Sequence, residues 1–195
     1  MKRFVKSMHE ADGLRGRGSL RLVVSGFAED EPVGVGDVLR TLDALPQFHL
    51  AGLNEIVYAP VPDVSYPSLG FRFPDRTVAE FDQQARAIFV YRLPELALFR
   101  HVLYHEVGHF VFFLVISSKV KKTWVTEIFP QSVSTTDYGA ESAAEDFAET
   151  YALYARDAEL LQEFPRKRAF MREQVFSGRV VTLKAAERAA ADAED

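Results

Sequence analysis

Short apolar runs with strand-like composition occupy the first half of the chain. Residues 19–25, 55–58 and 85–91 are rich in valine, isoleucine, leucine and aromatic side chains, which are common in β-strands. Residues 71–73 predict a further short extended piece, and the proline-rich residues 59–67 predict a loop before it. This pattern indicates a sheet of short strands.

Helical spacing of apolar side chains begins between the first two strands and dominates the second half of the chain. Asp37 can cap a short helix whose apolar positions run to Leu45, just before Pro46. A longer helix is predicted over residues 94–118, and another over residues 140–155. Strands that are followed by a run of helices predict an α+β fold.

The helix predicted over residues 94–118 is apolar around most of its circumference, which is typical of a buried helix. Its longest unbroken apolar run, residues 110–116, has seven residues, whereas a membrane span needs about 20. We therefore expect a core helix and no membrane partner.

The composition fits one compact domain. The chain has 195 residues, of which 48% are hydrophobic, and this is enough to bury a full core. We expect the domain to cover residues 19–178. Residues 1–18 are expected to form a flexible basic tail, and residues 179–195 a helical or disordered tail.

Charge and cysteine content bear on partners and compartment. The net charge of −5 at pH 7 argues against a nucleic-acid partner. The chain has no cysteine, which excludes thiolate metal ligands and fits a reducing compartment. The basic first residues are not followed by an apolar core, so no secretory signal peptide is visible. We expect a cytoplasmic protein, with export by a non-classical route as the alternative.

The residues with the clearest chemistry are His105-Glu106-Val107-Gly108-His109, in the middle of the long helix. Residues four apart share one face of an α-helix, so both imidazoles can reach one metal ion while Glu106 projects toward a water molecule. The alternative is two histidines and a glutamate that merely pack in the core. Burying these groups without partners is costly, which favours a metal site.

A carboxylate ligand is expected downstream of the two histidines. Glu141, Glu145 and Glu149 follow one another at intervals of four in the helix predicted over residues 140–155, with Asp146 alongside. No lysine or arginine lies three or four residues from any of these glutamates. Such a run usually marks a solvated acidic face. Beside a two-histidine helix that lacks only a carboxylate, it favours a ligand helix.

The downstream spacing points to a known family. Tyr138 stands seven residues before Glu145, which is followed directly by the sequence DFAE. Together with the upstream HEVGH motif, this spacing resembles the catalytic domains of the zinc metallopeptidase family that includes anthrax lethal factor and the Pro-Pro endopeptidases. Residues 156–159, with Pro165 and Phe170, also resemble the helical tail that follows the ligand helix in this family.

The resemblance implies a zincin-like fold: a small mixed sheet, an HExxH active-site helix and a following helix that carries a glutamate ligand. It implies one Zn²⁺ per chain, held by His105, His109 and Glu145. It also implies Glu106 as general base, Tyr138 as the phenol that stabilises the oxyanion, and Glu149 as a carboxylate that orients a ligand histidine.

The strand over residues 85–91 directly precedes the motif helix. In zincins the corresponding region supplies an edge strand that pairs with an extended peptide, so Ala87, Phe89 and Tyr91 are candidate substrate-binding residues by analogy. The alternative is an interior strand with no ligand role.

The remaining histidines and a cluster of lysines have weaker patterns. His101 lies four residues before His105, so it either packs or approaches the metal site, and packing is the more common role. His9 and His49 have no partner pattern and are interpreted as ordinary residues. Residues 119–122 are interpreted as a solvated basic loop near the site.

These features predict a zinc-dependent endopeptidase that hydrolyses a protein or peptide substrate with metal-activated water. One alternative is a zinc-stabilised protein-binding module without physiological proteolysis. Another is a delivered toxin effector peptidase with the same chemistry. Glu106 and Tyr138 argue against the binding module, because a purely structural zinc site needs neither residue.

Overall fold

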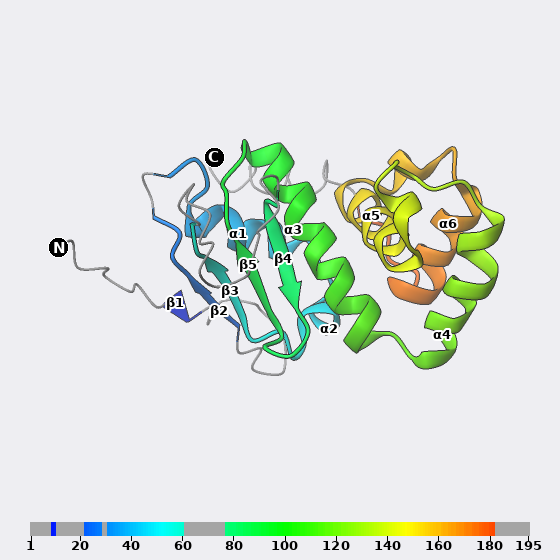
Figure 1. Ribbon diagram of the computed structural model, residues 1–195, viewed down its shortest axis with the longest axis horizontal. Coiled ribbons are helices and arrows are strands. Elements are labelled where there is room, and N and C mark those ends of the chain that lie inside the picture. Colours follow the sequence, from blue (N-terminus) through cyan, green and yellow to red (C-terminus); the bar gives the residue numbers. More distant parts are fainter. Residues whose placement is uncertain (1–8, 11–21, 29–30, 61–76, 182–195) are drawn as a thin grey trace, which may run out of the picture.

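The computed structural model describes residues 9–10, 22–28, 31–60 and 77–181. It is an α+β structure, as the sequence predicts. The sheet occupies one half of the molecule and helices α4, α5 and α6 occupy the other, with the long helix α3 between them (Figure 1).

Five short strands form one mixed sheet in the order β1-β2-β3-β5-β4. Their bounds are β1 His9–Glu10, β2 Val23–Ser25, β3 Glu55–Tyr58, β4 Ala79–Asp82 and β5 Ala87–Val90. The three central strands β2, β3 and β5 are parallel, whereas β1 and β4 pair antiparallel with their neighbours. The strands expected over residues 19–25, 55–58 and 85–91 correspond to β2, β3 and β5. The extended piece expected at residues 71–73 lies outside the described residues.

The expectation that residues 85–91 form an edge strand is wrong. Strand β5 is interior, between β3 and β4, and within the described residues β1 and β4 are the two edge strands. Ala87 points to a buried face, Phe89 pairs with Val57 and Glu80 on the neighbouring strands, and Tyr91 lies just beyond the strand. The reason is hydrophobicity on both faces, since Ala87, Ile88 and Val90 are all buried, as in strands covered on both sides.

The two helices between β2 and β3 are α1 Val35–Asp43 and α2 Gln47–Leu50. Asp37 is not the N-cap of α1, as expected from the sequence, because the helix begins after Gly34. Instead, Asp37 is in the first turn, where its carboxylate accepts a hydrogen bond from the Gly34 backbone N–H at 3.1 Å. Asp37 therefore still stabilises the start of the helix, as the N3 residue of a capping box and not as its N-cap.

Helix α3, Leu96–Phe110, is the core helix predicted over residues 94–118. It starts after Glu95 and continues as a π-helical turn over Val111–Val115. Buried side chains of the sheet, of α3 and of the helical half form one hydrophobic core. This core includes Val24, Ile56, Ile88, Phe99, Leu103, Val107, Phe110, Phe147 and Tyr151. No helix in the described part of the chain is both long and apolar enough to cross a membrane.

The helical half is built from α4 Ser118–Thr123, α5 Ala143–Arg156 and α6 Pro165–Phe170. Shorter turns join them: π-helical turns at Trp124–Ile128 and Met171–Val175, and 3₁₀ turns at Phe129–Gln131, Gly139–Glu141 and Ala158–Leu161. The prediction of a basic loop over residues 119–122 is wrong, because these residues lie in helix α4. The Ser117 hydroxyl caps α4 by accepting from the Val120 N–H at 3.3 Å.

Helix α5 is the predicted ligand helix, but it starts later than expected. Ser142 caps it by accepting a hydrogen bond from the Glu145 N–H at 3.1 Å. Glu141 therefore belongs to the preceding 3₁₀ turn, and the expected stripe of three glutamates on one helix is reduced to Glu145 and Glu149. At its other end, the Tyr154 hydroxyl donates to the Arg179 carbonyl at 2.8 Å.

Candidate metal centre

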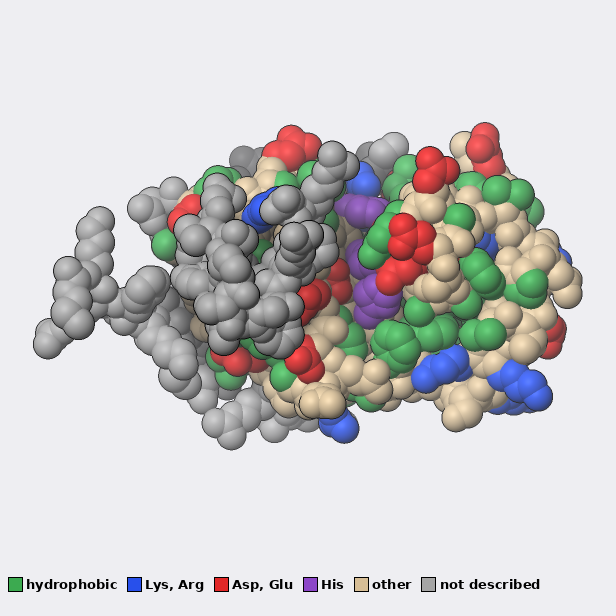
Figure 2. Space-filling view, viewed as in Figure 1, with side chains coloured by type: hydrophobic (Ala, Val, Ile, Leu, Met, Phe, Trp, Pro, Cys, Tyr) green, Lys and Arg blue, Asp and Glu red, His purple; other side chains and the backbone are tan. Residues whose placement is uncertain are grey.

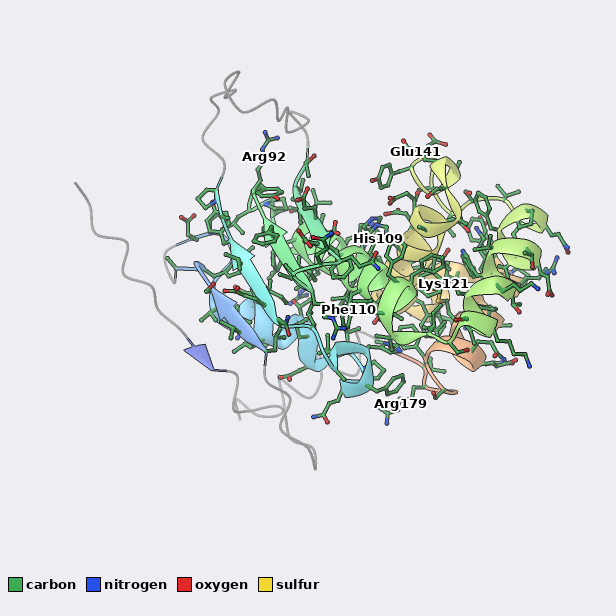
Figure 3. All side chains as sticks on the ribbon, turned by 60° about the horizontal axis from the view of Figure 1, so that its bottom comes forward. Arg92, His109, Phe110, Lys121, Glu141 and Arg179 are labelled. Carbon is green, nitrogen blue, oxygen red and sulfur yellow. The ribbon has the colours of Figure 1, made fainter. Side chains whose placement is uncertain are left out.

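Helices α3 and α5 approach each other closely at Gly108. A β-carbon at this position would lie 2.9 Å from Ala148 Cα, closer than real β-carbons come, and 3.2 Å from Tyr151 Cβ, which is tighter than most of their contacts. Glycine is therefore required where the two helices meet. Their contact brings the two histidines of the HEVGH motif opposite the two glutamates of α5. Figure 3 shows His109 on α3, between the sheet half and the α5 half.

Three side chains place donor atoms around one point. His105 Nε2 and His109 Nε2 are 3.0 Å apart, and Glu145 Oε2 lies 3.2 Å from each of them. Ligand atoms at about 2.0–2.1 Å from a tetrahedral zinc ion are about 3.3 Å apart, so this triangle matches three of the four zinc positions. His105, His109 and Glu145 are thus a fitting donor set for a metal ion. The histidine side chains line a hollow between the two halves of the molecule (Figure 2).

Glu149 holds the other side of His105. Its Oε1 atom accepts a hydrogen bond from His105 Nδ1 at 2.7 Å, one turn of α5 beyond Glu145. In the neutral form, which is the form that binds a metal, the Nδ1 hydrogen of His105 is directed at this carboxylate and the Nε2 lone pair is turned toward the donor triangle. This is the arrangement that a second carboxylate gives to metal-ligating histidines.

His101 contacts Glu149 and not the donor triangle. Its Nε2 atom lies 3.4 Å from the same Oε1 atom that His105 contacts. The sequence left open whether His101 packs or approaches the metal site. In the structure it packs beside the carboxylate of Glu149. His49, also interpreted as ordinary, is fully buried and contacts the Tyr151 hydroxyl at 2.8 Å and the Val175 carbonyl at 2.9 Å.

The charges of the cluster favour a cation. Burial would raise the pKa of Glu145, but hydrogen bonds from His105 and His109 lower it to about 2. Burial likewise opposes ionisation of Glu149, yet hydrogen bonds from His101 and His105 bring the pKa of that carboxyl well below its usual range. Burial would lower the pKa of His105, but Glu145 and Glu149 raise it to about 9. Two ionised carboxylates thus attract positive charge to the point where the imidazole nitrogens meet.

Glu106 is buried beside this cluster, with 7% of its surface exposed. Burial raises the pKa of its carboxyl, and Glu145 adds to this, while His105, His109 and a hydrogen bond from the Phe81 backbone act in the opposite direction. A carboxylate whose proton affinity is raised is suited to accept and return a proton near neutral pH. The contact with Phe81 also ties strand β4 to the site.

Tyr138 lies on the open side of the cluster, immediately before the 3₁₀ turn Gly139–Glu141, and half of its surface is exposed. Its ring centroid is 5.7 Å from that of His105. Burial, together with the negative charges of Glu145 and Glu106, raises the pKa of its phenol to about 12. Tyr138 is therefore a neutral hydrogen-bond donor throughout the physiological range.

Several predicted residues are not at the cluster, and others were missed. Glu141 is exposed and outside the donor set, and Ala87, Phe89 and Tyr91 belong to the region of interior strand β5. Sequence patterns missed the backbone of Phe81 and the side chain of Lys167, which forms a buried ion pair with Asp146. No local spacing could reveal either contact, because both join segments that are distant in the sequence.

Comparison of the chain with protein-family models, with curated proteins and with solved structures finds no match. The resemblance to zinc metallopeptidases therefore depends on the motif residues and on their spacing.

Proposed function

We propose that the protein is a zinc-dependent endopeptidase of the zincin type. The observation that carries this proposal is the donor triangle of His105, His109 and Glu145, with sides of 3.0–3.2 Å, directly beside the buried carboxylate of Glu106. A histidine pair and a glutamate leave one tetrahedral position open, which is the pattern of catalytic and not of structural zinc sites.

Zinc bound at the triangle supplies Lewis acidity, which polarises a carbonyl group and makes water a stronger acid. The chain's own residues supply the proton transfers. Glu106 accepts a proton from the attacking water and returns it to the amine that leaves when the peptide bond breaks. Its raised pKa suits both transfers, because a carboxyl of ordinary acidity would be a weaker base at neutral pH.

Tyr138 supplies a hydrogen bond to the oxyanion that develops on the peptide carbonyl. Its phenol stays protonated, since its pKa is raised to about 12, so it stabilises negative charge without adding a charge of its own. Because half of its side chain is exposed beside His105, a substrate can reach it from solvent. Glu149 keeps His105 oriented while the substrate exchanges.

The substrate is proposed to be an extended peptide or an unfolded segment of a protein. Strand β4 is the edge strand on the side of the site within the described residues, and the backbone of its Phe81 hydrogen-bonds Glu106. The pairing with a peptide backbone that was expected of residues 85–91 is therefore assigned to β4.

A zinc-stabilised binding module is a weaker explanation of the same residues. Such a module needs a closed set of four protein ligands and has no use for a buried carboxylate of raised pKa or for an exposed phenol beside the metal. The positions of Glu106 and Tyr138 favour an enzyme.

A direct test combines elemental analysis with a peptide-library cleavage assay. The parent protein is expected to hold about one zinc per chain and to cleave library peptides. Glu106→Gln is expected to retain zinc and the fold but to lose nearly all hydrolysis, while Glu141→Gln, at an exposed glutamate of the neighbouring turn, keeps both. Hydrolysis by Glu106→Gln at close to the parent rate would contradict the mechanism.

A further inference from the structure

A fully buried ion pair lies directly behind the candidate site. Lys167 Nζ, on α6, is 2.6 Å from Asp146 Oδ1, on α5, and neither side chain is exposed to solvent. Asp146 immediately follows Glu145 in the first turn of α5. Lys167 does not contact the donor triangle, and its ammonium group lies 5.9 Å from the ring centroids of Trp124 and Phe164. The pair therefore fixes α6 against the start of the helix that carries Glu145.

The Asp146 carboxylate also contacts the loop that leads to Tyr138. Burial raises the pKa of the Asp146 carboxyl, while Lys167, the Ser134 hydroxyl and the Thr135 backbone act in the opposite direction, and its Oδ2 atom is buried without a hydrogen-bond partner among the described residues. On the other side of Tyr138, Gly139 packs on the same residue, since a β-carbon there would lie 3.3 Å from Asp146 Cα and 3.5 Å from Oδ1. Both flanks of Tyr138 are thus held by Asp146.

The phenol of Tyr138 hydrogen-bonds Glu145 and its ring lies 5.7 Å from that of His105, but neither contact involves the backbone that carries the side chain. Half of its surface is exposed, and its turn is closed locally by the Gly139 N–H, which donates to Thr136 Oγ1 at 3.0 Å. A donor that stabilises a transition state must be held in place before the reaction, since a displacement of about 1 Å can cost about 100-fold in rate.

Stability alone gives little reason for the pair. Removing two charges from water costs free energy, and replacing a buried ion pair by apolar residues of similar volume is often neutral or stabilising. An ion pair fixes the relative orientation of the two segments that it joins, which apolar contacts do not. Here the short contact between Lys167 and Asp146 fixes α6 against the start of α5.

We propose that Lys167 and Asp146 are positioning residues, which hold residues 134–139 and thereby place the Tyr138 hydroxyl over the metal centre. This inference rests on the proposed peptidase function. It implies that the C-terminal helix α6, although outside the donor set, controls the rate of the reaction through Tyr138.

A double-mutant cycle on the zinc-loaded protein tests the coupling. The paired change Asp146→Asn with Lys167→Gln removes both charges but retains side chains that can hydrogen-bond, so that no lone charge is left buried. We expect kcat to fall about 10- to 100-fold with KM within about twofold of the parent, because the donor is displaced while the substrate still binds. In the Tyr138→Phe background, the same paired change should lower kcat by less than about twofold, since the affected hydroxyl is already absent.

The matched control is the exposed ion pair of Arg168 and Glu159, which joins the neighbouring position of α6 to the turn Ala158–Leu161. Neutralising it by Arg168→Gln with Glu159→Gln should leave kcat and zinc content at parent values. The inference is overturned if neutralising the buried pair and neutralising the exposed pair change kcat equally. It is also overturned if the buried-pair change lowers kcat by the same factor with and without the Tyr138 hydroxyl.

Hydrogen exchange gives an answer that does not need activity. The paired change at Asp146 and Lys167 should speed exchange of the amides of residues 134–139, while those of α3 around the histidines stay protected. Unchanged exchange in the 134–139 segment overturns the inference even if the protein is a peptidase. If the parent cleaves no peptide, the proposed function fails, and faster exchange still supports the anchoring role of the pair. The apolar paired change Asp146→Leu with Lys167→Met, which also leaves no lone buried charge, repeats the measurement should the first double variant fold poorly.

Discussion

Gly108 and Ala148 mark the point where the two helices of the candidate site meet: a β-carbon on Gly108 would lie 2.9 Å from the Cα of Ala148. The obstacle is backbone and the nearby Tyr151 Cβ, so it cannot turn aside as the end of a flexible side chain could. The middle of the HEVGH motif thus has a packing role that is separate from the chemistry of its histidines.

The first prediction is that Gly108→Ala separates α3 from α5. Overpacking of this kind typically costs about 1–3 kcal/mol, and it should weaken zinc binding because His105 and His109 move away from Glu145. Urea unfolding, followed by fluorescence of the single tryptophan Trp124, measures the first effect, and a competition assay with a chelator measures the second. Gly36→Ala is the control, since the nearest atoms there belong to the flexible Arg40 side chain. Equal stability of the two variants would contradict the requirement for glycine.

The second prediction concerns the donor triangle. His105→Ala and Glu145→Gln should each lose most of the zinc that the parent retains after dialysis, because each removes one of three protein ligands. Chelation of the parent should also lower its melting temperature, since a metal that binds only the folded state stabilises it. The exposed Glu141 provides the matched control as Glu141→Gln. Full zinc retention by both ligand variants would rule out the assignment.

The third prediction is that Glu149 supports the metal without binding it. Glu149→Gln retains an acceptor for His105 Nδ1 but removes the negative charge, and loss of such an outer partner typically weakens metal affinity by about 10- to 100-fold. Isothermal titration with zinc measures the change, and Glu163→Gln, at an exposed glutamate, controls for the lost charge. Parent-like affinity in Glu149→Gln would show that the hydrogen bond to His105 has no effect on the metal.

The fourth prediction isolates the Tyr138 hydroxyl. Tyr138→Phe keeps the ring, so zinc content and melting temperature should remain near those of the parent. Removing one oxyanion donor typically lowers kcat by about 10²–10³, while KM changes little. The comparison needs conditions in which chemistry limits the rate. An unchanged kcat would reduce Tyr138 to a residue of the turn before α5 and would weaken the proposed likeness to lethal-factor-type peptidases.

The fifth prediction follows from His49, whose pKa is lowered from 6.5 to about 4 chiefly by burial. The Val175 carbonyl can only accept, so Nε2 carries the hydrogen and Nδ1 accepts from the Tyr151 hydroxyl. The folded state thus holds neutral imidazole, while the unfolded chain takes up a proton below pH 6.5. Stability from this residue is present above pH 6.5 and is lost as the pH falls toward 4, by about 2–3 kcal/mol at pH 4.5.

Unfolding of chelated protein between pH 4.5 and pH 7 measures this loss. His49→Gln should be less stable than the parent at pH 7 but should show a shallower decline of the free energy of unfolding with falling pH, since it has no imidazole to protonate. Parallel curves for the two proteins would mean that other groups cause the acid sensitivity.

Local sequence patterns were sufficient for the elements that carry the site. The four-residue interval between His105 and His109 fixes them on one helix face wherever the helix packs, so the histidine pair could be predicted from spacing alone. The apolar circumference of α3 likewise predicted its burial, and the strands at β3 and β5 were found from their composition.

Features that depend on contacts between distant segments could not be predicted in this way. The position of β5 inside the sheet depends on pairing with β4, whose sequence Ala-Glu-Phe-Asp has no strong strand signal. Helix α5 begins after its cap Ser142, so Glu141 lies outside the helix. The spacing could not show this, because Glu141 and Glu149 are each four residues from Glu145.

The sequence by itself determined which side chains can share a helix face, because a helix repeats every 3.6 residues regardless of its surroundings. Only the tertiary structure decided which faces meet. The approach of α3 to α5 at Gly108 brings Glu145 and Glu149 to the two histidines, and the packing of α6 brings Lys167 to Asp146. These contacts span 21 to 44 residues of sequence and depend on the whole core, which no local period encodes.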